Sequence, residues 1–300
     1  MIFYTKPDWT ALVKENISVV IPNHNRSHLI GRAIESVLAQ TLPAQEIFVV
    51  DDGSTDSSCE LVSSRYPGVT LLKQEHRGVS AARNLGIRQA SCDWIALLDS
   101  DDEWLPSKLQ KQFSAWEKQP AYRVIHTNES WIRNGVPLKQ LKKHKKSGGY
   151  IFQQCLPLCV ISPSSIVVHA EVFEKVGLFN ENFPVCEDYD LWLRLCAEYP
   201  VLFLDEPLII KYGGHADQLS RKYFGMDRFR VRALDNVIRN ASLPVEDHDA
   251  AIAELQRKID IYLKGAEKHG NPDCVEEFRE MQAWYNSHHL PGRDALKAAR

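Results

Sequence analysis

Three short segments of the chain carry acidic and amide side chains directly after apolar runs. They are Pro22-Asn23-His24-Asn25, Asp51-Asp52-Gly53-Ser54-Thr55-Asp56 and Asp99-Ser100-Asp101-Asp102. Asp99 and Asp101 lie two positions apart, so an extended backbone would point both carboxylates to the same side. A carboxylate pair, together with substrate phosphates, is a common ligand set for Mg²⁺ or Mn²⁺. We therefore expect Asp99 and Asp101 to share a divalent cation.

The apolar runs before these segments are expected to be strands of one sheet. Strand patterns lie at 17–21, 46–50, 69–72 and 94–98, with helical spacing between them at 30–38, 56–65 and 79–90. Apolar strands that alternate with helices are typical of a doubly wound, mostly parallel, Rossmann-like α/β sheet. Ligands bind beyond the carboxyl ends of the strands in such a sheet. The three polar segments therefore converge on one edge, although each alone could be a turn or a helix cap.

The pattern is less regular after residue 120. Strands are expected at 165–168, 201–204 and 208–212, and helices at 170–176 and 188–197. A run of basic residues without Asp or Glu, followed by two glycines, predicts a mobile basic loop over 134–149. Its Lys142–Lys146 cluster could contact an anionic acceptor, a membrane surface or only water. From 225 onward only helical patterns occur, and their apolar stripes suit packing on the rest of the chain or dimerisation.

Composition excludes several classes of protein. Lys and Arg number 36 against 39 Asp and Glu, a net charge of −3, which disfavours a dedicated nucleic-acid binder. No apolar run approaches the ~20 residues of a membrane span, and the first sixteen residues lack the pattern of a secretory signal. Seven cysteines without a Cys-x-x-Cys pair fit free thiols in a reducing cytoplasm.

In order and spacing, the polar segments resemble the family 2 glycosyltransferases of the GT-A fold. The matching stretches are 17–26, 51–56, Gly78–Asn84, 99–102, Glu187–Arg194 and His215 with Gln218 and Ser220. The resemblance covers about residues 17–220. It implies an N-terminal extension (1–16), a GT-A domain (17–224) and a helical C-terminal region (225–300). Within the domain, 17–120 would bind the nucleotide and 121–224 the acceptor.

The resemblance also implies roles for the residues around the donor. Pro22, Asn23, His24 and Asn25 would border the base, with His24 where an aromatic ring often stacks on uracil. Asp52 would accept the uracil imide proton, and Asp51 would support that loop or the ribose. Arg83 would lie near the donor phosphates, and Asp99 with Ser100 near the ribose or the metal.

Metal and acceptor roles follow from the same resemblance. Asp101 would be the principal metal ligand, and His215 a further ligand or a diphosphate contact. Asp188 would be the base that takes the proton of the acceptor hydroxyl, with Glu187 beside it. Asp102 and Trp104 would line the acceptor side or support it.

The implied activity is inverting transfer of a sugar from a nucleotide-diphosphate donor, with UDP favoured, to an acceptor hydroxyl. The acceptor would be a glycan or a lipid-linked glycan of cell-surface polysaccharide or glycoconjugate synthesis. We expect a cytoplasmic protein that can rest against the inner membrane face and can dimerise, with no nucleic-acid partner. One alternative is a non-catalytic GT-A-like module that binds nucleotide-sugar or glycan. The other is a sugar-1-phosphate nucleotidyltransferase, although its Gly-rich basic loop is replaced here by Pro22–Asn25.

Overall fold

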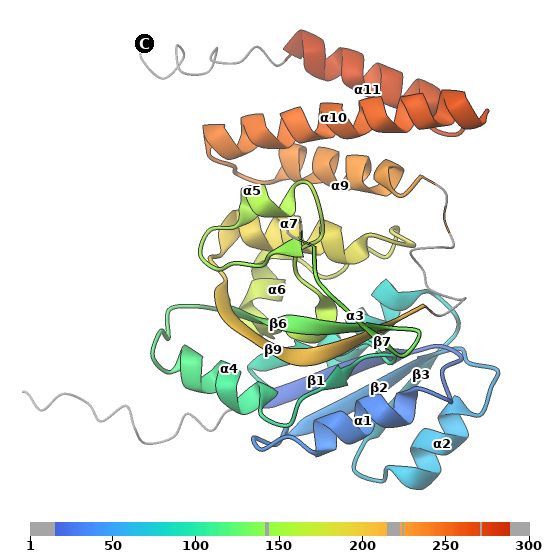
Figure 1. The fold of residues 1–300 in the computed structure, drawn as a ribbon, viewed down its shortest axis with the longest axis vertical. Coiled ribbons are helices and arrows are strands. Elements are labelled where there is room, and N and C mark those ends of the chain that lie inside the picture. The colour runs from blue at the N-terminus through green and yellow to red at the C-terminus, as the bar shows by residue number, and fades with distance from the viewer. Residues whose placement is uncertain (1–15, 142–143, 215–222, 224, 271, 289–300) are drawn as a thin grey trace, which may run out of the picture.

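Nine strands form one mixed sheet in a computed structural model that describes residues 16–141, 144–214, 223, 225–270 and 272–288. The strand order is β3-β2-β1-β4-β8-β6-β9-β5, and β7 pairs with β6 (Figure 1). The strands are β1 Ile17–Asn23, β2 Glu46–Asp52, β3 Thr70–Gln74, β4 Trp94–Leu97, β5 Glu103–Trp104, β6 Val124–Arg133, β7 Val136–Leu138, β8 Val167–His169 and β9 Leu202–Gly213. The first four are parallel, as predicted for the first half of the chain.

Helices cover both faces of this sheet (Figure 1). They are α1 Ile30–Leu38, α2 Ser58–Arg65, α3 Val79–Gln89, α4 Lys108–Trp116, α5 Phe152–Cys155, α6 Ala170–Val176, α7 Glu187–Glu198, α9 Asp227–Asn240, α10 Val245–His269 and α11 Val275–His288. The alternating side chains of β1 show how the sheet packs against an apolar core on each of its faces. Ile17, Val19 and Ile21 belong to one apolar core with α1 and α4, whereas Val20 belongs to the other with α3 and α7.

Strand register brings the polar segments to one edge. Asn23 at the end of β1 pairs with Asp51 near the end of β2. On the other side of β1, Val20 pairs with Leu97, the last residue of β4. The segment that starts at Asp99 therefore lies beside Pro22, as the parallel arrangement predicts.

The second half departs from expectation at two places. Residues 136–138 form β7, antiparallel to β6, and Lys146 is buried, so the prediction of a mobile basic loop over 134–149 is wrong for these residues. Lys142 and Lys143 lie outside the described residues. The two strands expected at 201–204 and 208–212 are one strand, β9. Its register against β6 shifts near Asn128, and this irregularity is what separated the two apolar runs.

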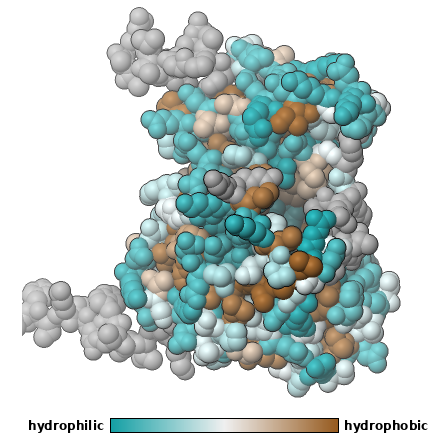
Figure 2. Space-filling model, viewed as in Figure 1, coloured by the Kyte–Doolittle hydropathy of each residue, from teal (hydrophilic) through white to brown (hydrophobic). Residues whose placement is uncertain are grey.

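The C-terminal helices α9, α10 and α11 stack above α5 and α7, on the side away from the sheet (Figure 1). Their predicted apolar stripes, such as Phe229 and Val237 on α9, are buried in the same core as α7. Figure 2 shows hydrophilic residues over most of the visible face of both the sheet region and these helices. None of the helices formed by the described residues has both the length and the apolar character needed to cross a bilayer.

Candidate active site

A cavity of about 1120 Å³, hereafter the first cavity, opens at the carboxyl ends of β1, β2 and β4. Most of the predicted site residues line it: Pro22, Asn23, His24, Asn25, Asp52, Arg83, Asp99, Ser100, Asp101, Asp102, Glu187 and Asp188. Two of the remaining three do not appear in its wall. Asp51 lies beneath the loops and Trp104 is buried in the core, while His215 lies outside the described residues.

The loops after β1 and β2 hold each other. Asn25 adopts a left-handed backbone with φ 52°, and its side-chain oxygen accepts hydrogen bonds from the Thr55 and Asp56 backbone N–H groups at 2.8 and 3.3 Å. The Asp51 carboxylate accepts from the Asn23 amide and from the Ser54 N–H at 3.1 and 2.9 Å. Burial opposes ionisation, but the hydrogen bonds lower the pKa of Asp51 below its ordinary value. Asp51 therefore supports the loop, which is one of its two predicted roles.

Asp52 fixes the loop that follows β3. One carboxylate oxygen accepts from the Gln74 side chain and the Arg77 N–H, and the other accepts from His76 Nδ1 and the Gly78 N–H, all at 2.6–2.8 Å. A carboxylate offers about four acceptor positions, so none is left over. The predicted contact to a uracil imide is therefore not available in this arrangement, because the Gln74 or His76 side chain would first have to leave.

Two imidazoles lie above Asp52. The rings of His24 and His76 stack with centroids 4.2 Å apart, and His24 Nδ1 contacts the Asp52 carbonyl oxygen at 2.8 Å. Sequence reasoning missed His76, because it lies in a loop without a motif. His24, Asp52 and His76 each offer a possible metal-ligand atom within 4.8 Å of the others. This group fits a hard divalent cation poorly, since two of its ligands are nitrogens and its carboxylate is already satisfied.

The acidic segment after β4 is a turn. The Asp102 N–H donates to the Asp99 carbonyl oxygen at 3.0 Å, so the expectation of extended backbone over Asp99–Asp101 is wrong. Both carboxylates nevertheless line the first cavity. The Asp101 carboxylate receives no hydrogen bond from another described residue, and burial together with the Asp99 charge raises its pKa. A half-buried carboxylate pair of this kind, with one member unsatisfied, fits a divalent cation.

Asp102 and Trp104 hold this turn from below. Asp102 accepts from the Ser164 hydroxyl at 2.6 Å and from the Tyr212 N–H at 3.2 Å, and burial raises its pKa to about 8. The Trp104 indole N–H donates to the Ser164 carbonyl at 2.8 Å. Its ring is 1% exposed, so of the two predicted roles of Trp104 burial leaves support of the site and not a place in the cavity wall. Trp104 acts through Ser164 on the turn.

Arg83 joins the two ends of the site. One Nη group donates to Asp99 and the other to Glu187, each at 2.7 Å, and the guanidinium is almost fully buried. Burial alone would lower the pKa of Arg83, but the two carboxylates raise it above its ordinary value. Arg83 therefore lies in the cavity wall. Both of its Nη groups are engaged by carboxylates, so it positions them.

Asp188 lies in the first turn of α7, next to Cys186, whose backbone is left-handed with φ 62°. The Cys159 thiol donates to Asp188 Oδ2 at 3.3 Å, and burial followed by the Asp188 charge raises the pKa of Cys159, which keeps the thiol protonated. Burial and the Asp188 charge likewise raise the pKa of Glu187 to about 7. Two acids thus stand side by side, one clamped by Arg83 and one facing the cavity.

Lys211 on β9 was missed by sequence reasoning. It lines the first cavity, and its side-chain amine makes no hydrogen bond or close ion pair with any residue in the described part of the chain. Burial alone would lower its pKa, but Asp102 and Glu129 raise it above the ordinary value, so it carries a charge. The only signal was a lysine directly after the apolar run Leu208–Ile210.

The sequence model of glycosyl transferase family 2 matches residues 18–177, more than half of the chain. The chain belongs to glycosyltransferase family 2. An uncharacterized glycosyltransferase of Rickettsia felis is 32% identical to this family 2 member over 218 residues, 69% of the chain. The chain spans only 35% of that relative's length.

A second relative has a more specific name. The UDP-Glc:alpha-D-GlcNAc-diphosphoundecaprenol beta-1,3-glucosyltransferase WfgD of Escherichia coli is 32% identical over 187 residues. The match covers 61% of this chain and 70% of WfgD.

Solved structures place this family 2 member in the GT-A fold. S. aureus TarS in complex with UDP-GlcNAc superimposes with a TM-score of 0.65 at 18% identity, covering 81% of this chain and 71% of that one. The mannosyltransferase PcManGT from Pyrobaculum calidifontis, in complex with GDP-Man and Mn²⁺, gives a TM-score of 0.58 at 17% identity, covering 90% and 80%. The predicted fold class, a mostly parallel sheet with C-terminal helices, is confirmed.

Proposed function

We propose that this protein transfers a sugar from a nucleoside diphosphate donor to an acceptor hydroxyl, with inversion at the anomeric carbon. The observation that carries the proposal is the first cavity itself. Asp99 and Asp101 enter it from the end of β4, Asp188 enters it from α7, and Arg83 ties the two sides together. An acidic rim for a cation and a separate carboxylate for a proton are the two groups that this reaction needs.

Asp99 and Asp101 would hold Mn²⁺ or Mg²⁺. Among the described residues none donates a hydrogen bond to the Asp101 carboxylate, and Asp99 keeps one oxygen beyond the one that Arg83 engages. A divalent ion bound there supplies positive charge beside the diphosphate that leaves with the nucleoside. Arg83 keeps Asp99 in place, and Asp102 with Ser164 keeps the turn in shape.

Asp188 would act as the base. Its carboxylate lines the cavity and is oriented by the Cys159 thiol and by the Tyr189 N–H at 2.7 Å. As the acceptor oxygen attacks the anomeric carbon, Asp188 takes the proton of that hydroxyl. A single base opposite the leaving diphosphate leads to one in-line displacement and therefore to inversion.

We propose UDP as the donor nucleotide and a lipid-linked glycan as the acceptor. Two proteins support this choice by name: WfgD, which is named for UDP-Glc and a diphosphoundecaprenol acceptor, and TarS, whose structure contains UDP-GlcNAc. The base would lie over the loops that Asn25 and Asp52 organise, with His24 and His76 offering a stacking surface. Membership of a glycosyltransferase family disfavours the nucleotidyltransferase alternative. Against the non-catalytic alternative, the chain retains both Asp101 and Asp188 in one cavity.

One experiment separates these possibilities. Purified protein is incubated with UDP-glucose, UDP-N-acetylglucosamine or GDP-mannose, with Mn²⁺ or EDTA, and nucleotide release is measured. We expect release with a UDP-sugar and Mn²⁺ that falls by about 10²–10⁴-fold in Asp188→Asn, while that variant still binds UDP. Donor binding without release in the wild type under every condition would favour the non-catalytic module.

A further inference from the structure

The hairpin of β6 and β7 is an exposed feature that lies outside the wall of the first cavity (Figure 1). Its two-residue turn is formed by Asn134 and Gly135, whose backbones are left-handed with φ 51° and 78°. Asn-Gly is the preferred sequence for this type of tight hairpin turn. The turn fixes the register of the two strands, so that Trp131 lies opposite Leu138.

Three large apolar side chains are exposed on this hairpin and just after it. Val136 is 60% exposed, Leu138 42% and Leu141 60%, all within six positions of the chain. The other large apolar side chains that are exposed in the described part of the chain are far apart in sequence: Leu38, Tyr150, Val245, Ile261 and Trp284. A single exposed apolar residue is ordinary, whereas a group of them on one surface marks a site of interaction.

Basic side chains accompany the apolar ones. Arg133, Lys139 and Lys145 are exposed, and none of the three side chains forms a hydrogen bond or close ion pair with a described residue. The sequence has no Asp or Glu from residue 130 to residue 170. This stretch therefore presents apolar groups and positive charge together, without acidic groups of its own.

We propose that this hairpin surface binds an anionic phospholipid bilayer. Its members are Arg133, Val136, Leu138, Lys139, Leu141 and Lys145. Peripheral proteins are held to such membranes by apolar side chains that enter the headgroup boundary and by cations that attract the anionic lipids. Each cation near the surface strengthens binding by about fivefold, so three together contribute about a hundredfold.

The backbone of β7 favours a bilayer over a protein that would add a strand to the sheet. Pro137 lies opposite Ile132, in the second residue pair after the turn. In an antiparallel hairpin with a two-residue turn, the N–H and C=O groups of this pair point away from the partner strand. Proline has no N–H, so β7 lacks a donor that an added strand would need. For the same reason β7 has one polar group fewer to remove from water at a lipid surface.

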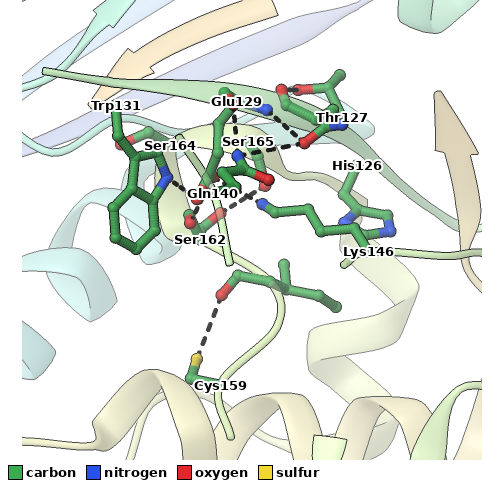
Figure 3. Close-up of polar contacts among 12 residues, drawn as sticks. His126, Thr127, Glu129, Trp131, Gln140, Lys146, Cys159, Ser162, Ser164 and Ser165 are labelled. Atoms are coloured by element: carbon green, nitrogen blue, oxygen red, sulfur yellow. Dashed lines mark hydrogen bonds and ion pairs between the residues drawn. The ribbon is translucent and has the colours of Figure 1, made fainter. Parts of the chain in front are cut away.

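The hairpin is held firmly to the body of the protein. The Trp131 indole N–H donates to the Glu129 carboxylate at 2.7 Å, and the Gln140 side chain donates to the Glu129 carbonyl oxygen at 2.5 Å. Glu129 also accepts from Lys146 Nζ at 2.7 Å and from the Ser162 hydroxyl at 2.6 Å. Figure 3 shows these side chains gathered around Glu129. A membrane bound at the hairpin would therefore hold the whole domain in a defined orientation.

That orientation places the bilayer beside the proposed active site. Trp131 pairs with Lys211 of β9 and Ile132 pairs with Tyr212. Lys211 and Tyr212 line the first cavity, so the hairpin is the next strand pair beyond its wall. A lipid-linked acceptor would then reach the cavity from the bilayer surface. This consequence rests on the proposed function, whereas membrane binding itself does not.

The test measures sedimentation of the full chain with vesicles of phosphatidylcholine, alone or with about 30% phosphatidylglycerol. We expect the wild type to bind the anionic vesicles at least tenfold more tightly than the neutral ones. Raising NaCl to about 0.5 M should weaken this binding, because salt screens the cations. Lys139→Gln should weaken binding to anionic vesicles about fivefold, and Val136→Ser with Leu138→Ser at least tenfold.

Matched controls change similar residues elsewhere. Lys118 is an exposed lysine just after α4, and Val245 on α10 is 62% exposed. Lys118→Gln and Val245→Ser should leave vesicle binding unchanged. Circular dichroism checks that each variant is folded, and the single change Lys139→Gln keeps the test decisive if the double serine variant is not.

Several results would overturn the membrane proposal. They are equal binding to neutral and anionic vesicles, equal losses in hairpin and control variants, and binding that the hairpin variants do not weaken. Absence of vesicle binding in a protein that still releases nucleotide would also overturn it, and would leave a protein partner as the occupant of this surface. Vesicle binding without nucleotide release under any condition would instead contradict only the proposed function.

Discussion

The two cavities differ in how their carboxylates are balanced. In the first cavity Asp99, Asp101 and Asp102 lie within one turn, and the Asp101 carboxylate forms no hydrogen bond or close ion pair with the described residues, although the charges of Arg26 and Lys211 act on it. A second, smaller cavity of about 230 Å³ shares Asp188 and Lys211 with the first. In the second cavity the buried Glu129 is paired with a buried Lys146. A buried charge without a partner is costly, whereas a paired one can form part of a stable scaffold. This difference is the reason why we assign the proposed cation to the first cavity and not to the second.

The largest expected effect comes from the unpaired carboxylate. Asp101→Asn should lower the rate of UDP-sugar turnover by about 10³-fold, because a cation at this position is worth several kcal/mol of charge stabilisation. Turnover is measured as nucleotide release at saturating Mn²⁺. Asp93→Asn is the matched control, since Asp93 is exposed next to the amino end of the same strand. Full activity of Asp101→Asn, or of the wild type in EDTA, would contradict the proposal that the first cavity binds a cation through Asp101.

The paired carboxylate should matter for stability instead. Glu129→Gln leaves Lys146 buried without its counter-charge and should lower the free energy of unfolding by roughly 3 kcal/mol at pH 7. Urea denaturation followed by circular dichroism measures this difference. The double variant Glu129→Gln with Lys146→Met should recover most of the loss. A single-variant loss no larger than that of a surface substitution would contradict the pairing.

The same pair predicts a pH dependence. Burial opposes ionisation of Glu129, but Lys146 lowers its pKa from 4.5 to about 2 in the folded state. The stabilisation that ionised Glu129 contributes is therefore complete above pH 4.5, the pKa of this group in the unfolded chain. It is lost as the pH falls from 4.5 towards 2, the pKa in the folded protein. The difference in stability between the wild type and Glu129→Gln should shrink over this range.

Added Mn²⁺ should distinguish the cavities most directly. At about 100 times its Kd the ion should stabilise the wild type by about 2.7 kcal/mol, seen as a rise in the thermal midpoint. Asp101→Asn should lose this rise, while Glu129→Gln should keep it. His76→Ala should keep it as well. Loss of the rise in His76→Ala alone would place the ion at the His24–Asp52–His76 group.

Local sequence predicted the first cavity well because parallel strands end at one edge of a sheet. Consecutive strand ends place Asn23, Asp51 and Asp99 together whatever the rest of the chain does. The same reasoning did not predict the surroundings of Asp52, whose four hydrogen-bond donors come from the end of β3 and the loop after it. Nor did it show that Trp104 is buried and bonds to Ser164 below the acidic turn, because these contacts come from residues distant in sequence.

By itself, the sequence determined the alternation of strands and helices, the edge at which the acids gather and the family to which they belong. These features depend on periodicity and on spacing along a few dozen residues. Only the tertiary structure decided that Arg83 clamps two carboxylates, that Lys146 is buried and that Arg230 reaches a cavity beside Asp188. Such contacts join residues up to about a hundred positions apart, and no local pattern specifies which distant charge will neutralise which.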